Sequence, residues 1–205
     1  MKTDARFVYV FAHGAGAGMN HPFMHRAAEA LEARGIATHR YEFPYMQAKK
    51  SRPDPPAVAE AAVRKAVAEA ALKHPGLPIF AGGKSFGGRM TSQAQASQPM
   101  PGVHGLVFFG FPLHPPGRPG TSRGEHLTSV DVPMLFLQGT RDEFAQLDLL
   151  QRVIARLGDR ATLHLIADGD HSFKVPKRTG KSEADVMKEL ADTFVEWTGK
   201  WLTTG

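Results

Sequence analysis

Short apolar runs alternate along the chain with longer segments in which apolar residues recur at every third or fourth position. The runs are rich in β-branched and aromatic side chains, which favours strands, whereas the longer spacing favours helices. Strands that alternate with helices predict a mainly parallel sheet covered on both faces, a three-layer α/β/α sandwich. Six strands are expected, at Arg6–Ala12, Ile36–Tyr41, Pro78–Ala81, His104–Phe109, Pro133–Gln138 and Thr162–Ile166.

Five helices are expected between and after these strands. The second is predicted to begin with Asp54 as its N-cap, and the fifth with a capping box formed by Ser182 and Asp185. Two segments, Phe43–Pro53 and the proline-rich Pro112–Thr128, are expected to be irregular loops. The expected helices are Pro22–Ala33, Pro55–Lys73, Phe86–Ser97, Phe144–Leu157 and Glu183–Trp201.

In the fifth expected helix, one apolar stripe recurs at spacings of three and four residues, and we expect it to pack in the core. Its members are Val186, Leu190, Phe194, Trp197 and Trp201.

Composition narrows the class of protein. With 205 residues, of which 42% are hydrophobic and 22% charged, the chain suits one globular domain over residues 1–205. The chain contains no cysteine, which excludes disulfides and thiolate chemistry and is compatible with a reducing compartment. No signal peptide or membrane-spanning stretch is recognisable, so a cytoplasmic location without membrane attachment is expected.

The charge pattern does not indicate a nucleic-acid partner. The net charge is +5, but the 25 Lys and Arg residues are scattered among 20 acidic residues. Aromatic residues lie mostly in apolar runs and are not interleaved with basic ones, as a groove for single-stranded nucleic acid requires. A solvated basic surface is therefore expected.

Two glycine-rich turns follow apolar runs, and neither has the spacing of a nucleotide-binding motif. The turn at Gly83-Lys84-Ser85 lacks the first glycine of a phosphate loop, because position 78 is proline. The turn at His13–Gly18 follows the first strand, but Met19 and His21 occupy the positions where a dinucleotide fingerprint needs its third glycine. Both nucleotide readings are disfavoured, and no cofactor is expected.

The stretch Gly83-Lys84-Ser85-Phe86-Gly87 is a Gly-x-Ser-x-Gly pattern between an expected strand and an expected helix. This context is typical of a nucleophile elbow, a sharp turn that exposes the serine hydroxyl above the edge of the sheet. The helix that follows points its amides and the positive end of its dipole at the place where negative charge develops. Ser85 is therefore the candidate nucleophile.

A serine nucleophile needs a base and an orienting acid, which in such folds follow in the order serine, acid, histidine. Asp142 follows the fifth strand and His171 follows the sixth, so both are expected at the carboxyl edge of the sheet, where catalytic groups collect. Asp142 could alternatively cap a helix, in which case Glu143 and Asp148 are the reserve acids.

Two backbone amides are expected to form an oxyanion hole. One belongs to Phe86, and the other to the loop after the first strand, with Ala15 as first choice and Gly16 as the alternative. His13, Gly14 and Gly16 of that loop are expected to border the substrate.

Lys84 and Arg89 flank the serine and are candidate substrate-binding residues, which would suit an anionic substrate. Arg89 lies near a helix N-terminus, where a cation is disfavoured, so either a buried acid pairs with it or it binds a substrate carboxylate. Ordinary core packing and a role as pocket wall are both open for four apolar residues. They are Phe43, Tyr45, Met46 and Phe111.

His21 and His25 have the spacing of paired metal ligands. Pro22 and the lack of a glutamate beside the first histidine do not fit the zinc-protease motif, so capping or surface roles are expected. No metal site is predicted.

Four stretches, HGAGAG, FPYM at Phe43–Met46, GKSFGGRM and GDHSF, together resemble the small, lidless α/β-hydrolases related to dienelactone hydrolase. The resemblance extends over almost the whole chain. It implies an α/β-hydrolase fold with no lid domain and a six-stranded sheet of order 2-1-3-4-5-6. Ser85 stands where dienelactone hydrolase has cysteine, so a dienelactone substrate does not follow.

The residues and the resemblance together predict a serine hydrolase that cleaves a small soluble ester or thioester through an acyl-enzyme. The alternative is a non-catalytic α/β-hydrolase-fold module that serves in binding or as a scaffold.

Overall fold

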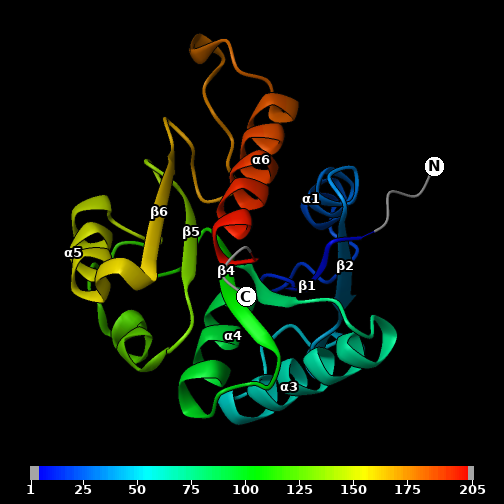
Figure 1. Ribbon diagram of the computed structural model, residues 1–205. Helices are drawn as coiled ribbons and strands as arrows, with labels where there is room; N and C mark the ends of the chain where they lie inside the picture. The colour runs from blue at the N-terminus through cyan, green and yellow to red at the C-terminus, as the bar shows by residue number, and fades with distance from the viewer. Residues whose placement is uncertain (1–4, 203–205) are drawn as a thin grey trace.

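The computed structural model describes residues 5–202 of the chain. Six strands, all parallel to their neighbours, form one sheet in the order β2-β1-β3-β4-β5-β6, which confirms the expected architecture (Figure 1). The strands are β1 (Phe7–Ala12), β2 (Ile36–Tyr41), β3 (Ile79–Lys84), β4 (Val103–Phe109), β5 (Met134–Gly139) and β6 (Ala161–Ile166).

Helices cover both faces of the sheet, so the molecule has three layers (Figure 1). On one face lie α1 (Pro22–Glu32) and α6 (Glu183–Leu202), and on the other α3 (Pro56–Lys73), α4 (Phe86–Ser97) and α5 (Leu147–Leu157). Four short elements complete the described chain: α2 (Pro44–Gln47), η1 (Ser122–Ser129), η2 (Gly158–Arg160) and η3 (Lys177–Thr179).

Each face of the sheet has its own hydrophobic core. Beneath α1 and α6 the core is aromatic, and Tyr9 of β1 packs edge-on against Phe194 of α6 with ring centroids 4.8 Å apart. The apolar stripe predicted for α6 lies in this core from Val186 to Trp197, whereas Trp201 is 37% exposed. The capping box also forms, because Asp185 N–H donates to Ser182 Oγ and Ser182 N–H donates to Asp185 Oδ2.

The sequence predicted an irregular loop at Phe43–Pro53, but the segment is partly helical. It contains α2, which begins at Pro44, where the fixed φ of proline suits the first helical position. Asp54 does not cap α3, because its Oδ2 accepts a hydrogen bond from Tyr45 N at 2.9 Å, and the N-cap of α3 is Pro55. The prediction of Asp54 as N-cap was wrong.

Two further boundaries differ from the expectation. The end of the segment Pro112–Thr128 forms the 3-10 helix η1, which begins at Ser122 once the last proline of that segment, Pro119, has passed. The helix expected from Phe144 begins only at Leu147, because the Phe144 N–H is bonded to the side chain of Asp142. Hydrophobic spacing could not reveal this local competition from a side chain.

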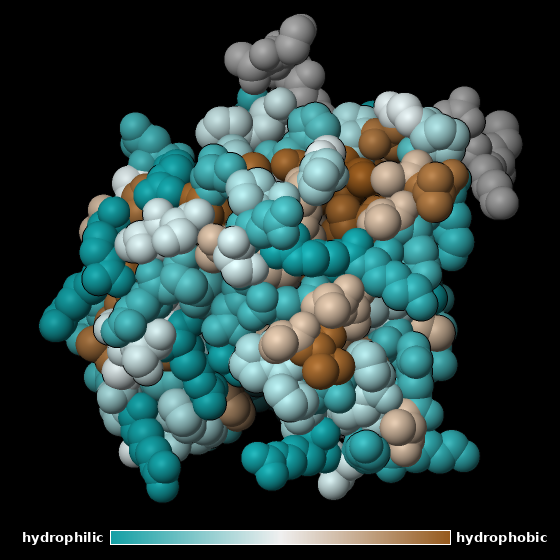
Figure 2. Space-filling model, turned by 90° about the horizontal axis from the view of Figure 1, so that it is seen from below, coloured by the Kyte–Doolittle hydropathy of each residue, from teal (hydrophilic) through white to brown (hydrophobic). Residues whose placement is uncertain are grey.

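The surface on the α3 and α4 side is hydrophilic over most of its area (Figure 2). Hydrophobic side chains form small separate patches there, and the large hydrophobic residues exposed in the described chain are Val58, Leu72 and Trp201. Among residues 5–202, no helix has both the length and the apolar character that crossing a membrane requires.

Candidate active site

Ser85 lies on a sharp turn between β3 and α4. Its backbone has φ 49° and ψ −116°, a positive φ that is strained for a residue with a side chain. The flanking glycines permit the turn, because a Cβ on Gly83 would lie 2.4 Å from Ala12 O, and one on Gly87 would lie 2.5 Å from His13 O. The predicted elbow is therefore present, and it packs closely against the end of β1.

His171 and Asp142 converge on this serine. His171 Nε2 lies 2.8 Å from Ser85 Oγ, and His171 Nδ1 lies 2.7 Å from Asp142 Oδ2. The side chain of Asp142 is fully buried and that of His171 is 17% exposed. The reserve acids Glu143 and Asp148 are exposed and do not bond to His171. Three residues far apart in the chain thus form one continuous hydrogen-bonded series.

The carboxylate of Asp142 accepts hydrogen bonds from two further groups besides His171. Gln138, a buried residue near the end of β5, donates from Nε2 to Asp142 Oδ2 at 2.5 Å, and its Oε1 accepts from Phe111 N at 2.8 Å. Phe144 N donates to the other carboxylate oxygen at 2.8 Å. Gln138 was missed from the sequence, although a lone amide in the apolar run MLFLQG was the available signal.

The turn that presents His171 is pinned by its neighbour Asp170. One carboxylate oxygen of Asp170 accepts hydrogen bonds from Ser172 N at 2.8 Å and Lys174 N at 2.9 Å. The ring of Phe144 packs beside the imidazole, with centroids 4.2 Å apart. These contacts fix the direction in which the imidazole points.

Burial lowers the pKa of His171 below its ordinary value, and the positive charge of Lys84 acts in the same direction. The hydrogen bond and the charge of Asp142 oppose the shift but do not overcome it. His171 is therefore neutral at neutral pH. With Nδ1–H donating to Asp142, its Nε2 is free to accept the proton of the Ser85 hydroxyl.

Two amides near Ser85 are suited to bind an oxyanion. Phe86 is the first residue of α4, so its N–H has no partner within the helix. In the described chain, the Ala15 N–H makes no hydrogen bond. The alternative, Gly16, is already engaged, because its N–H donates to Tyr45 Oη at 3.0 Å.

His13 is buried beneath this loop. Its Nδ1 lies 2.8 Å from Gly14 O, and its Nε2 accepts from Phe43 N at 3.1 Å, so backbone groups engage both ring nitrogens. His13 and Gly16 do not line the cavity at Ser85, whereas Gly14 and Ala15 do. We expect His13 to hold the shape of the loop.

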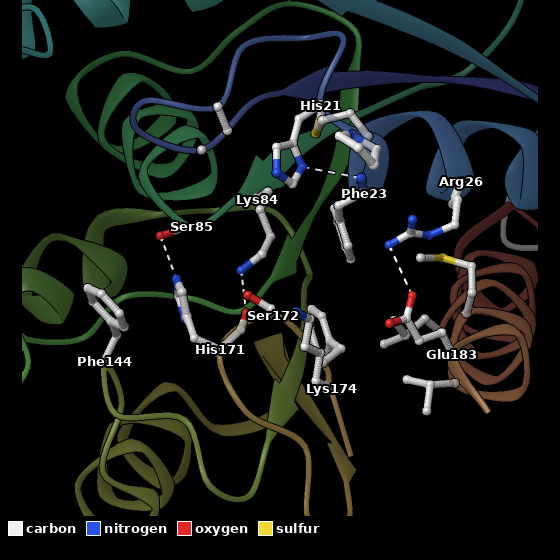
Figure 3. A pocket seen from close by; sticks show the side chains of 18 of the residues that line it. His21, Phe23, Arg26, Lys84, Ser85, Phe144, His171, Ser172, Lys174 and Glu183 are labelled. Atoms are coloured by element: carbon white, nitrogen blue, oxygen red, sulfur yellow. Dashed lines mark hydrogen bonds and ion pairs between the residues drawn. The ribbon is translucent and has the colours of Figure 1, made fainter. Parts of the chain in front are cut away.

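A cavity of about 580 Å³ opens beside Ser85 and His171, between the sheet edge and the helices α1 and α6 (Figure 3). Its apolar wall was not predicted and is formed by Phe23, Met24, Phe173, Val186, Met187 and Leu190.

The residues considered as pocket walls lie elsewhere. Phe43, Tyr45 and Phe111 are buried in the core under α3 and α4, and Met46 packs against the same core. Of the two roles left open for these residues, core packing is therefore the one observed, because the cavity opens on the α1 and α6 side of the sheet edge.

Lys84, which lines the same cavity, bends toward the loop of His171 (Figure 3). Its Nζ donates to His171 O at 2.5 Å and lies 5.8 Å and 5.5 Å from the ring centroids of Phe23 and Phe173. Burial lowers the pKa of Lys84 to about 8, although Asp142 and Asp170 favour its charged form from a distance.

The family model for an alpha/beta hydrolase domain matches residues 5–199 of the chain. The protein belongs to the α/β-hydrolase family. The described part of this hydrolase has the six-stranded parallel sheet of the fold and no lid domain.

Solved structures of other α/β-hydrolases share this fold at low sequence identity. A lidless α/β serine hydrolase from Xanthomonas campestris is 20% identical, with a TM-score of 0.74 over 95% of this chain and 84% of its own. A dienelactone hydrolase from Anabaena variabilis is 19% identical, with a TM-score of 0.73 over 96% and 87%. The esterase domain of a Rhodothermus marinus protein is 14% identical, with a TM-score of 0.69 over 98% and 89%.

Arg89 of the hydrolase does not line the cavity. No carboxylate of residues 5–202 lies within 4.0 Å of its guanidinium, so the expected buried acid is not its partner. Its Nε is buried without a hydrogen bond, and its CZ atom lies 6.0 Å from the ring centroid of Phe86. Burial and the nearby charge of Arg123 lower its pKa.

The hydrolase contains a second serine–histidine contact, between Ser92 of α4 and His126 of η1, at 2.7 Å. The Ser92 hydroxyl donates to Arg89 O at 2.9 Å, so it accepts from His126 and gives up no proton to it. Asp131 of the same region binds Gln95 Nε2 at 3.0 Å. Ser92 is fully buried, and these bonds fasten η1 to α4.

His21 caps α1, since its Nδ1 accepts from Phe23 N at 3.2 Å. This confirms the capping role that the sequence suggested. Within residues 5–202, no group of three or more potential ligand side chains is arranged to hold a metal ion.

Proposed function

We propose that this α/β-hydrolase cleaves small esters or thioesters through an acyl-enzyme, with Ser85 as nucleophile, His171 as general base and acid, and Asp142 as the orienting acid. The observation that carries the proposal is the hydrogen-bonded series from Asp142 through His171 to Ser85 at the mouth of a cavity. Cytoplasmic action stays a prediction that rests on the sequence alone.

The first half of the reaction begins when Ser85 Oγ attacks the scissile carbonyl carbon. As the new C–O bond forms, the hydroxyl proton passes to His171 Nε2, 2.8 Å away. Asp142 accepts the Nδ1–H bond, which fixes the tautomer and stabilises the imidazolium that results.

The carbonyl oxygen then carries the negative charge of the tetrahedral intermediate. We assign its stabilisation to the N–H groups of Phe86 and Ala15, the amides without other partners. Each such donor is worth about 3 kcal/mol in the transition state. His171 returns its proton to the departing alcohol or thiol as the bond to the leaving group breaks.

The second half uses water. The water oxygen attacks the acyl carbon while His171 takes a proton from the water. His171 then returns that proton to Ser85 Oγ as the carboxylic acid product is released. The cavity of about 580 Å³ lies within the size range of small-molecule sites, which favours a compact acyl substrate.

Hydrolysis of a panel of p-nitrophenyl esters with neutral and anionic acyl chains of increasing length tests the proposal. The wild type should release p-nitrophenol from short members of the panel. Ser85→Ala should lower kcat/KM by on the order of 10⁴-fold or more, because it removes the nucleophile.

Ser92→Ala is the matched control, since it removes the other serine that contacts a histidine. Its rate should stay within about twofold of the wild type. Folded wild-type protein that turns over no ester, or equal rates in the wild type and Ser85→Ala, would favour the binding or scaffold module instead.

A further inference from the structure

The ammonium of Lys84 is a half-buried charge in the cavity with few partners. It can donate three hydrogen bonds, yet in the described chain it makes one, to His171 O. No carboxylate oxygen of residues 5–202 lies within 4.0 Å of Nζ. Partly removing a cation from water without a close counter-ion costs free energy, so its placement favours a partner that the described residues do not supply.

The other cations at the cavity do not play this part. Arg26 is paired with Glu183 at 3.4 Å, at the end of the cavity away from Ser85 (Figure 3). Lys174 is exposed, so water solvates and screens it. Lys84 is therefore the half-buried cation beside Ser85 and His171, with Phe23 and Phe173 bordering its ammonium.

We propose that the substrate carries a carboxylate close to its scissile bond and that Lys84 binds this carboxylate. This inference deepens the proposed ester or thioester hydrolysis and rests on it. The carboxylate must lie near the reacting carbonyl for two reasons. Lys84 directly precedes Ser85 in the chain, and its ammonium donates to the backbone oxygen of His171, whose ring contacts Ser85. One ammonium balances one carboxylate charge, whereas a phosphate dianion would leave excess charge in a site with an apolar wall.

The test compares two substrates of nearly equal shape, ethyl hydrogen succinate and the ethyl ester of succinamic acid, which replaces the carboxylate with a neutral amide. The wild type should prefer the anionic ester in kcat/KM. Lys84→Met keeps the length of the side chain and removes the charge, and it should reduce that preference roughly 10- to 100-fold, the effect expected of a charge-assisted hydrogen bond.

Lys65→Met is the charge-matched control, because Lys65 is 79% exposed on α3 and pairs only loosely with Glu69 at 3.8 Å. It should leave the preference unchanged. Acetyl glycolate carries its carboxylate in the alcohol part of the ester, whereas ethyl hydrogen succinate carries it in the acyl part. Comparing the kcat/KM values of the two esters shows which part of the substrate holds the carboxylate that Lys84 binds. A wild type that hydrolyses the neutral ester equally well, or equal losses for both esters in Lys84→Met, would overturn the inference and leave the proposed hydrolase intact.

The pH dependence gives a second readout. Lys84 faces Asp142 and Asp170, which favour its charge, and it lies beside His171. Because its pKa is about 8, the preference for the anionic ester should fall as pH rises through that value and the ammonium loses its proton. A preference that stays constant up to pH 10 would contradict the role of Lys84.

If the wild type hydrolyses neither ester, the proposed function fails and binding still tests Lys84. Succinate should bind Ser85→Ala in calorimetry, and the same variant that also carries Lys84→Met should bind it at least tenfold more weakly. Equal binding, or none in either variant, would overturn the inference.

Discussion

The side chain of His171 lies between a buried carboxylate and a strained serine, and two opposing influences set its pKa. Burial and the charge of Lys84 disfavour the imidazolium, whereas Asp142 favours it through a 2.7 Å hydrogen bond. Burial prevails in the resting protein. In the proposed reaction the imidazole gains a proton from Ser85 and the same carboxylate serves as its counter-ion, so we expect the site to favour charge only as the reaction proceeds.

The pH–rate profile for a neutral ester tests this balance. Only neutral His171 can accept the proton, so kcat/KM should fall as pH drops through the pKa of His171 in the free enzyme. Because that pKa is lowered, the midpoint of the acid limb should lie below 6.5, the ordinary value. Lys84→Met removes a nearby positive charge and should move the midpoint upward. A wild-type midpoint above 6.5 would contradict this account.

The Gly-x-Ser-x-Gly motif and the order of residues along the chain predicted three residues of the candidate site. Ser85, Asp142 and His171 could be predicted because each follows a recognisable strand, and parallel strands bring their carboxyl ends to one edge. The role of Gln138 could not be predicted, because a lone amide at the end of a strand does not indicate which side chain it bonds. Only the fold shows that it donates to Asp142. Arg89 is close to Ser85 along the helix yet does not line the cavity, so its binding of a substrate carboxylate stays a prediction.

The strand–turn–helix element around Ser85 depends on close backbone contact. Helix α4 begins so near the end of β1 that its first turn has no space for a side chain at Gly87, where a Cβ would lie 2.5 Å from His13 O and 2.7 Å from Ala12 C. These neighbours are backbone atoms, which cannot swing aside as a flexible side chain can. A side chain at this position would therefore force the backbone of β1 and α4 apart.

Gly87→Ala should therefore lower the free energy of unfolding by about 1–3 kcal/mol, the range seen for overpacked interiors. Urea denaturation followed by circular dichroism measures it. Gly120→Ala is the control, because nothing lies within 4 Å of a Cβ at that position, and it should change stability by less than about 0.5 kcal/mol. Equal effects of the two substitutions would show that the close approach does not limit the elbow.

At the element level, the strands were predicted better than the loops. Apolar runs mark buried parallel strands directly, and all six were found, with β3 extending beyond its expected end to Lys84. The start of α5 and the hydrogen bond of Asp54 depended instead on single side-chain contacts with backbone amides. Such contacts compete with regular structure and leave no periodic signal in the sequence.

Over the whole molecule, two helices distant in the chain form most of the apolar wall of the cavity. Helix α1 follows the first strand and α6 lies near the end of the chain, yet both pack on the same face of the sheet (Figure 1), and both line the cavity that opens at Ser85. The sheet edge that carries Ser85, Asp142 and His171 was predictable from strand order. The apolar wall was not, because hydrophobic periodicity does not tell which face a helix covers. The solved structures compared share the fold at 14–20% identity, so substrate choice must be read from the cavity itself.

Labelling with a fluorophosphonate, followed by peptide mass spectrometry, tests whether Ser85 is an activated nucleophile. We expect one adduct on the peptide that contains Ser85, a rate of labelling that falls at acid pH with protonation of His171, and no adduct in folded Ser85→Ala. Wild-type protein that is folded yet unlabelled, or an adduct that persists in Ser85→Ala, would contradict the proposed role of Ser85.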